Sequence, residues 1–365
     1  MTPTAKFFPA CSLALILVAV APWPTLADDP PIAVTSAPVG YVATTCQGGS
    51  DTLVSVPFHR PAAWAGMLDA APSAGDDSVL LTLVGDPEFD EGQLLAAPHY
   101  VLFGSGGALA GEWFEVISHN GSEVEVEAPL TALQDASAGD PVMIIPHWTL
   151  ASLLPPATQP TAHLSEGSLL TQRGTEVLFF DRDSEGIQLA PNRKFFVTTA
   201  GWFEAADGTP EAGDVLVPPG LMLVIRHPEG APSTVFVARQ QVFTGPLVQP
   251  IRRSESQALD NALAAPRPIP VRLADLDLDD EVFTPSSSND KGDRMDELLV
   301  YDNAEAAINK QPSATYFRTP VGWVEDADGF PAADDTTVDG AQGLVIRKAA
   351  GPGDSTLRWL NAPRY

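Results

Sequence analysis

Apolar and polar residues alternate with a period of two over much of the chain. In residues 122–127, two valines alternate with three glutamates. Successive side chains of a strand point to opposite faces, so this segment predicts a strand with one apolar and one acidic face. Asn120-Gly121 before it is typical of a hairpin turn. The same reasoning predicts strands in the first half of the chain at 39–46, 52–58, 79–84, 100–103, 112–117 and 142–145.

The second half continues this pattern of short apolar segments separated by turn residues. Strands are expected at 176–180, 194–199, 201–204, 221–225, 234–238 and 357–360. Residues 39–46 and 52–58 flank a Gly-Gly-Ser-Asp turn and predict a hairpin. Helical spacing is limited to 147–154 and to 254–265, where Ser254 and Gln257 form a capping-box pattern.

Two stretches of the chain are near-copies of each other. Residues 176–226 align without a gap with residues 297–347, at an offset of 121, and 21 of the 51 positions are identical. The centre of each copy is a Gly-Trp pair, an acidic residue two positions after the tryptophan, and an Asp-Gly pair. Such similarity predicts an internal duplication.

These patterns predict an all-β fold of two or three small antiparallel β-barrel or sandwich modules with few short helices. The last two modules are expected to be related by duplication. The expected divisions are a signal peptide at 1–27, an N-terminal β domain at 28–160, a β module at 161–250, a linker with a short helix at 251–290 and a second β module at 291–365.

The N-terminal residues predict export from the cytoplasm. Lys6 precedes an apolar segment at 12–20, and Thr25-Leu26-Ala27 provides small residues at both recognition positions of a signal peptidase. The apolar segment is too short for a bilayer, which needs roughly 20 residues. We therefore expect a secreted or extracytoplasmic protein (periplasm, cell surface or extracellular) without an integral membrane segment after cleavage.

Charge and cysteine content narrow the choice of partners. The net charge is −27, which disfavours nucleic acid and anionic membrane surfaces. Cleavage near Ala27 would remove Cys11 and leave Cys46, so no intramolecular disulfide is expected. The expected partner is an extracellular or cell-surface ligand, with polysaccharide as one alternative.

Several short motifs resemble those of an uncharacterised family of secreted proteins from Verrucomicrobia-type bacteria. They are Pro38-Val-Gly-Tyr-Val42 near the expected mature N-terminus, 50–57, 146–150, and Gly343-Leu-Val-Ile-Arg-Lys348 near the C-terminus. The resemblance spans most of the mature chain. It implies secretion and the same architecture, and it supplies no catalytic mechanism.

The duplicated tryptophans are the strongest candidates for a binding site. An exposed Trp202 or Trp323 could stack on a sugar ring while Glu204 or Glu325 accepts hydrogen bonds from hydroxyl groups. The alternative is that each indole closes the core of its module, because aromatic residues dominate small β cores, and the residues favour this second interpretation.

Carboxylates repeated in both copies suggest calcium as a cofactor. Asp207 and Asp214, with Asp328 and Asp335 in the other copy, could supply oxygen ligands. Asp-Gly pairs also form turns without any metal, and we favour a protein without a cofactor.

No catalytic constellation stands out. Asp181 and Asp183 follow an apolar strand as in phosphotransferases of the haloacid-dehalogenase type, but Asp183 is replaced by Ala304 in the other copy. Asp181 and its counterpart Asp302 are therefore expected to be turn residues at strand ends. The six histidines lack the spacing of a zinc site.

These observations favour a secreted, non-enzymatic protein of structural or adhesion type, although they leave enzymatic activity open. The first alternative is a carbohydrate-binding protein with paired tryptophan platforms. The second is an extracytoplasmic hydrolase, which would need a cleft where a histidine or paired carboxylates converge.

Overall fold

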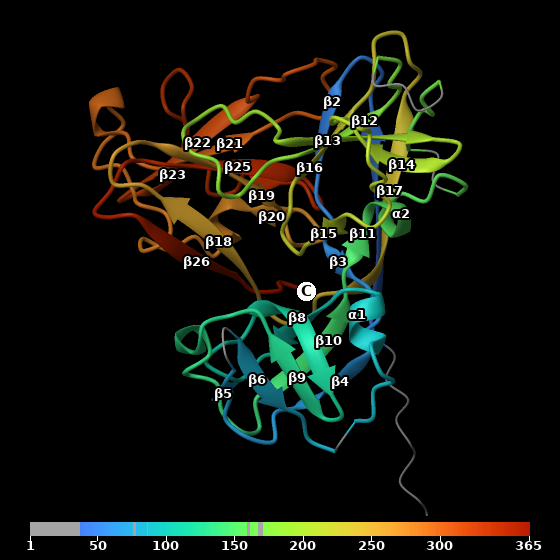
Figure 1. Cartoon of the computed structure of the whole chain (residues 1–365). Helices are drawn as coiled ribbons and strands as arrows, with labels where there is room; N and C mark the ends of the chain where they lie inside the picture. The colour runs from blue at the N-terminus through green and yellow to red at the C-terminus, as the bar shows by residue number, and fades with distance from the viewer. Residues whose placement is uncertain (1–36, 76–77, 86, 159–160, 167–170) are drawn as a thin grey trace, which may run out of the picture. The chain divides into compact units, whose positions relative to one another are not determined.

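The computed structural model describes residues 37–75, 78–85, 87–158, 161–166 and 171–365 (Figure 1). The expected signal peptide at 1–27 lies outside these residues. Nearly all regular structure is antiparallel strand, with two four-residue α-helices, which confirms the all-β prediction. In the described part of the chain, no helix has the length and apolar character needed to cross a bilayer.

One group of strands, here called the inserted domain, forms a seven-stranded sheet in the order β4-β10-β7-β8-β9-β6-β5. A bridge between Leu68 and Leu83 joins the segments that follow β4 and β6, so the sheet curls round an apolar core. Its elements are β4 (Trp64–Met67), β5 (Ser73–Ala74), β6 (Val79–Thr82), α1 (Gln93–Ala96), β7 (His99–Phe103), β8 (Trp113–Asn120), β9 (Glu123–Val126), the 3-10 helix η1 (Leu130–Ala132) and β10 (Pro141–Pro146).

The strands on either side of the inserted domain form the first module. Its five-stranded sheet has the order β14-β13-β12-β16-β2, and β1 pairs along β17 (Figure 1). Its elements are β1 (Val39–Cys46), β2 (Asp51–Val54), β3 (Phe58–His59), β11 (Trp148–Thr149), α2 (Leu150–Leu153), β12 (Glu176–Phe179), β13 (Arg193–Thr198), β14 (Gly201–Glu204), β15 (Leu216–Val217), β16 (Leu223–Arg226) and β17 (Thr234–Val242).

The remaining strands form the second module, in which the five-stranded sheet has the order β23-β22-β21-β25-β19 and β18 pairs with β26. Its elements are β18 (Leu247–Arg253), β19 (Leu259–Ala264), β20 (Val271–Arg272), the 3-10 helices η2 (Leu273–Asp275) and η3 (Lys291–Asp293), β21 (Glu297–Val300), β22 (Ala314–Thr319), β23 (Gly322–Glu325), β24 (Thr337–Val338), β25 (Gly343–Lys348) and β26 (Ser355–Asn361).

The two modules repeat the same strand order. Strands β12, β13, β14 and β16 of the first module correspond to β21, β22, β23 and β25 at the offset of 121. The outer strands β2 and β19 also correspond, although they lie outside the aligned stretch. Each module is thus built from more chain than the sequence alignment covers.

Three expectations about the chain's organisation were wrong. β1 and β2 do not pair with each other; they pair with β17 and β16, so the expected hairpin is absent. The same pairing means that 28–160 is not a separate domain, because its first strands belong to the first module and only β4 to β10 form the insertion. Likewise, residues 251–290 are not a linker, since they include β19 and β20 of the second module.

The helix expected at 254–265 is also absent. Residues Leu259–Ala264 form β19, whose six residues are paired along β25. Backbone pairing with a neighbouring strand outweighs the local helical pattern here. The other helix is present as α2, capped by a reciprocal pair of contacts between Thr149 and Ser152.

Each module extends one loop over the other. The first arm, residues 181–192 between β12 and β13, reaches the second module, where the Gly186 carbonyl accepts from the Asp260 amide at 2.9 Å. The second arm, residues 302–313 between β21 and β22, reaches the first module, where the Ala307 carbonyl accepts from the Asp51 amide at 2.9 Å. Gly186 and Ala307 are counterparts, which means that they occupy matching positions at the offset of 121. Each module therefore receives the same backbone hydrogen bond from the arm of the other.

The side chains of the same two aspartates also accept hydrogen bonds from the arm of the other module. Asp51 Oδ2 accepts the backbone amide of Asn309 at 2.8 Å, and Asp260 Oδ2 accepts that of Gln188 at 2.7 Å. Gln188 and Asn309 are counterparts with φ of 57° and 54°, a left-handed conformation that few non-glycine residues adopt. The same unusual backbone conformation therefore presents an amide to each aspartate.

An arginine within the same module holds each aspartate in place. Arg226 Nε and Nη2 donate to the two carboxylate oxygens of Asp51 at 2.6 and 2.8 Å. Arg347 does the same for Asp260 at 2.7 and 3.0 Å. Bidentate pairs of this kind fix the orientation of the carboxylate as well as adding energy. Each aspartate thus joins a strand of its own module to the arm of the other.

Removing this carboxylate charge should weaken the contact between the modules. We expect Asp260→Asn to lower the free energy of unfolding by about 3 kcal/mol, because the Asp260 carboxylate is only 5% exposed and its arginine loses a charged partner. Asp183→Asn is the matched control on the first arm, since the Asp183 side chain is 87% exposed, and should change stability by less than about 0.5 kcal/mol. Urea unfolding of both variants measures the difference, and equal stabilities would contradict this role.

Candidate functional site

A cavity of about 610 Å³ lies between the two modules. Its floor is an apolar cluster that includes Leu53, Leu178, Met222 and Val224 of the first module, with Ala262 and Tyr301 of the second packed against it. Successive side chains of β12 alternate between faces, so Val177 and Phe179 fill the core of the first module while Leu178 faces the cavity. Its volume lies within the range of small-molecule sites, about 300–1,000 Å³.

Unequal residues at counterpart positions shape the floor. A β-carbon added at Gly343 would lie 2.6 Å from Cγ of Met222, its counterpart in the other module. Two side chains cannot occupy this place together, so a methionine in one copy requires a glycine in the other. The frame is nearly symmetric, whereas the cavity that it encloses is not.

Arginine neutralises the carboxylates that line the cavity. Besides the two Asp–Arg pairs, Arg294 lies 3.3 Å from Glu297 and 3.2 Å from Asp326. Lys310, unlike the arginines of the cavity, is not paired with a carboxylate in the part of the chain that the structure describes. Its Nζ donates to the Asp302 carbonyl at 2.9 Å, and within the described residues no carboxylate oxygen lies within ion-pairing distance of it.

Burial shifts the pKa of two side chains that line the cavity, Tyr301 and Lys310. Desolvation raises the pKa of Tyr301 to about 12, with a smaller contribution from the charge of Asp260, so its hydroxyl stays protonated at neutral pH and can donate a hydrogen bond. Desolvation also lowers the pKa of Lys310, against the opposing effect of nearby carboxylates led by Asp302. The cavity therefore offers a phenol and an ammonium group beside an apolar floor.

Neither tryptophan forms the exposed platform that the sequence offered as a candidate binding site. Trp202 is only 2% exposed, and its indole Nε1 donates to the Leu154 carbonyl at 2.9 Å. Trp323 is 4% exposed and its ring packs 4.9 Å from that of Phe283. Both indoles fill module cores, where no sugar ring can stack on them. The alternative interpretation, in which each indole closes its core, describes the structure.

The carboxylates expected beside the tryptophans are half-buried and lie in β14 and β23. Glu204 accepts two hydrogen bonds from Arg193 at 2.9 and 2.8 Å, which together with the charge of Arg193 lower its pKa against a smaller effect of burial. Glu325 lies in β23, opposite Tyr316 of β22. None of the predicted ligand-binding residues, Trp202, Glu204, Trp323 and Glu325, lines the cavity.

The candidate calcium ligands do not converge. Asp207 and Asp328 are exposed in turns in which Gly208 and Gly329 have φ of 80° and 82°, a conformation that favours glycine. Asp214 is exposed, and Asp335 accepts from Arg272 at 3.1 Å. Among the residues that the structure describes, no group of three or more histidine, cysteine or carboxylate side chains is placed to hold a metal. The turn interpretation of Asp207 and Asp328 fits these positions.

The strand-end aspartates behave as predicted. Asp181 Oδ1 accepts the amide of Asp183 at 2.9 Å, and Asp302 Oδ1 accepts that of Ala304 at 2.7 Å. These are side-chain turns at the start of each arm. Asp183 itself points to solvent, so the phosphotransferase-like pair is not assembled.

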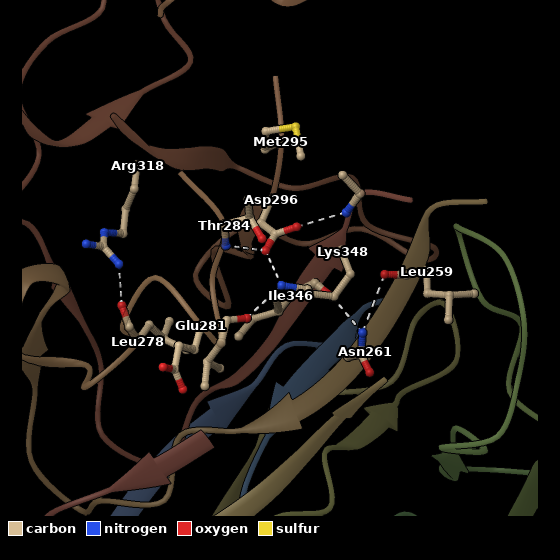
Figure 2. A network of polar contacts seen from close by, with 12 residues as sticks. Leu259, Asn261, Leu278, Glu281, Thr284, Met295, Asp296, Arg318, Ile346 and Lys348 are labelled. Atoms are coloured by element: carbon tan, nitrogen blue, oxygen red, sulfur yellow. Dashed lines mark hydrogen bonds and ion pairs between the residues drawn. The ribbon is translucent and has the colours of Figure 1, made fainter. Parts of the chain in front are cut away.

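The second module contains a buried ion pair between a lysine and an aspartate. Lys348 and Asp296 are in direct contact and almost completely buried, and Lys348 Nζ also donates to the Val282 carbonyl at 2.6 Å (Figure 2). Asp296 further accepts the amides of Thr284 and Ala349 at 2.6 and 2.9 Å. Desolvation lowers the pKa of Lys348, while the charge of Asp296 opposes that shift.

The first module holds a neutral pair in the same place. The counterparts of Lys348 and Asp296 are His227 and Thr175, whose Nδ1 and Oγ1 lie 2.9 Å apart. Burial, with a smaller effect of His163, lowers the pKa of His227 to about 4, so this histidine is neutral at pH 7. Its Nε2 lies 2.6 Å from the hydroxyl of Thr234. Both pairs brace the start of β12 or β21, and neither lines the cavity.

No family model, no curated protein and no solved structure matches this chain. The resemblance to a secreted family therefore stays a prediction.

The two brace pairs can be exchanged as a test. Asp296→Asn should destabilise the protein by about 3–5 kcal/mol, because it leaves the Lys348 ammonium buried without a counter-ion. The double variant Asp296→Thr with Lys348→His copies the first module and should destabilise the protein by at least about 1 kcal/mol less than Asp296→Asn. The reason is that Ser355, the counterpart of Thr234, has a buried hydroxyl without a partner among the described residues and could bond to the introduced histidine, as Thr234 bonds to His227. Urea unfolding compares them, and a double variant as unstable as the single one would contradict the equivalence of the two pairs.

Proposed function

We propose that this chain is a secreted, non-enzymatic β-module protein that acts by binding a ligand in the cavity between its two modules. The observation that carries the proposal is the cavity itself, which two copies of one module enclose with reciprocal arms. A frame held by bidentate ion pairs is organised before the ligand arrives, which reduces the entropic cost of binding.

Charge pairing in the cavity favours binding over chemistry. Its four carboxylates, Asp51, Asp260, Glu297 and Asp326, each have an arginine partner. The oxygens of these carboxylates are already engaged by guanidinium groups, so they are poorly placed to act on a bound molecule. The proposal needs no cofactor.

Secretion is part of the proposal and rests on the N-terminal residues and on composition. The signal-peptide pattern at 1–27 directs the chain out of the cytoplasm, and a net charge of −27 favours solubility there. The structural or adhesion-type role thus becomes the capture of a small molecule or of an exposed group on a larger extracellular ligand. A polysaccharide ligand loses its main support, since both tryptophans are buried.

Methionine-methyl NMR tests the proposal directly. Met222 lies in the cavity floor, whereas Met67, at 53% exposed, lies in the inserted domain and serves as the internal control. We expect some members of a small-molecule fragment library to shift the Met222 methyl signal while leaving that of Met67 unchanged, and to be recovered unaltered. Failure of every fragment to shift Met222 selectively would contradict binding. Conversion of a bound fragment, abolished by a substitution in the cavity, would show that the protein is an enzyme.

A further inference from the structure

The two ends of the cavity share one frame but carry different side chains. At one end the second arm lies against the first module. There the Asn309 amide donates to Asp51, and Lys310 is the next residue of the arm. At the other end the first arm lies against the second module. There the Gln188 amide donates to Asp260, and Leu189 is the next residue of the arm. Lys310 and Leu189 are counterparts, so one end presents an ammonium group where the other presents an isobutyl group.

Among the residues that the structure describes, no carboxylate forms an ion pair with the ammonium group at the first end. The neighbouring Asp51 is already engaged by two nitrogens of Arg226, and the other carboxylates of the lining are paired with Arg294 or Arg347. Lys310 is partly buried, and the Asp302 carbonyl accepts from its Nζ, although an ammonium group has three donors. An anionic ligand group would supply a further, charged partner.

The rest of the cavity suits an apolar body. Between the two ends the floor consists of aliphatic side chains with Phe180 packed against them. Tyr301 adds a hydroxyl that remains a donor at neutral pH, and the charged groups that act on it are Asp260 and Arg347, at the other end of the cavity from Lys310. The cavity therefore places a cation at one end of a surface that favours hydrocarbon.

We propose that the cavity binds an organic acid with an apolar body, the carboxylate at Lys310 and the hydrocarbon chain extended over the floor towards Leu189. This inference rests on the proposed binding function and specifies its ligand class. Binding needs no covalent step. The carboxylate forms a charge-assisted contact with the ammonium group, and the chain removes apolar surface from water.

Three eight-carbon probes with different head groups test the inference on the full-length mature protein. Octanoate should shift the Met222 methyl signal and bind at least about tenfold more tightly than octan-1-ol, because the alcohol has no negative charge to pair with the ammonium group. Octylamine should bind more weakly than either, since its ammonium group would meet that of Lys310. Titrations followed by NMR or calorimetry give the three affinities.

The arms provide the matched variants. Lys310→Leu gives the second arm the residue that the first arm already carries, and should remove the preference for octanoate over octan-1-ol while leaving octan-1-ol binding within about twofold. Lys291→Leu, at an exposed lysine in the 3-10 helix at 291–293, is the control and should leave both affinities unchanged. Thermal unfolding of each variant checks that the fold is retained.

The outcomes separate this inference from the proposed function. If octan-1-ol or octylamine binds as tightly as octanoate, or if Lys310→Leu keeps the preference, the organic-acid inference is overturned while binding in the cavity stands. If octanoate does not shift Met222 but other fragments do, the ligand class is again wrong. If no molecule shifts Met222 selectively, the proposed function fails as well.

Discussion

The reciprocal contact between the two arms and the two aspartates is the constraint on which the rest of the structure depends. Asp51 and Asp260 are each held by a bidentate arginine from the same module and each accept an amide from the arm of the other. Neither module completes this contact alone. The cavity, its floor and the different side chains at its two ends exist because the arms cross between the modules.

A duplicated frame allows one copy to change where the other compensates. Met222 fits because its counterpart is Gly343, and the buried ion pair of Lys348 and Asp296 replaces a neutral pair without changing the strand that it braces. The Asp–Arg pairs are alike in the two modules, and so are some residues that line the cavity, such as Leu178 and Leu299. Met222 and Lys310 differ from their counterparts Gly343 and Leu189, and these differences give the two ends of the cavity different chemistry.

Much of the fold was predictable from the sequence. Strands were predicted from the local alternation of apolar and polar residues, and the two related modules from the alignment of the chain with itself at the offset of 121. The strand pairing was not. β1 and β2 are separated from β17 and β16 by the whole inserted domain, and no local pattern distinguishes that pairing from a hairpin. For the same reason, β19 reads locally as a capped helix although it pairs along β25.

The site was less predictable than the fold. Conserved tryptophans between the copies signalled a shared role, but their direction depends on packing, and both point into cores. Arg226 and Arg347 are identical in the two copies and could have been noticed. Their aspartate partners lie outside the aligned stretch, however, so the pairs could not be assembled from the sequence. Lys310 was hidden because it differs from its counterpart, which is the property that makes it informative.

Amide hydrogen exchange at Gln188 and Asn309 tests the central claim most directly. Both residues are exposed in arm loops, and their amides donate to the aspartate of the other module, with no second acceptor among the described residues. If the arms hold the modules together, both amides should exchange with a free energy close to that of global unfolding. Exchange at the rate of a freely exposed loop would show that the arms are not held, and that the cavity between the modules is not a preformed site.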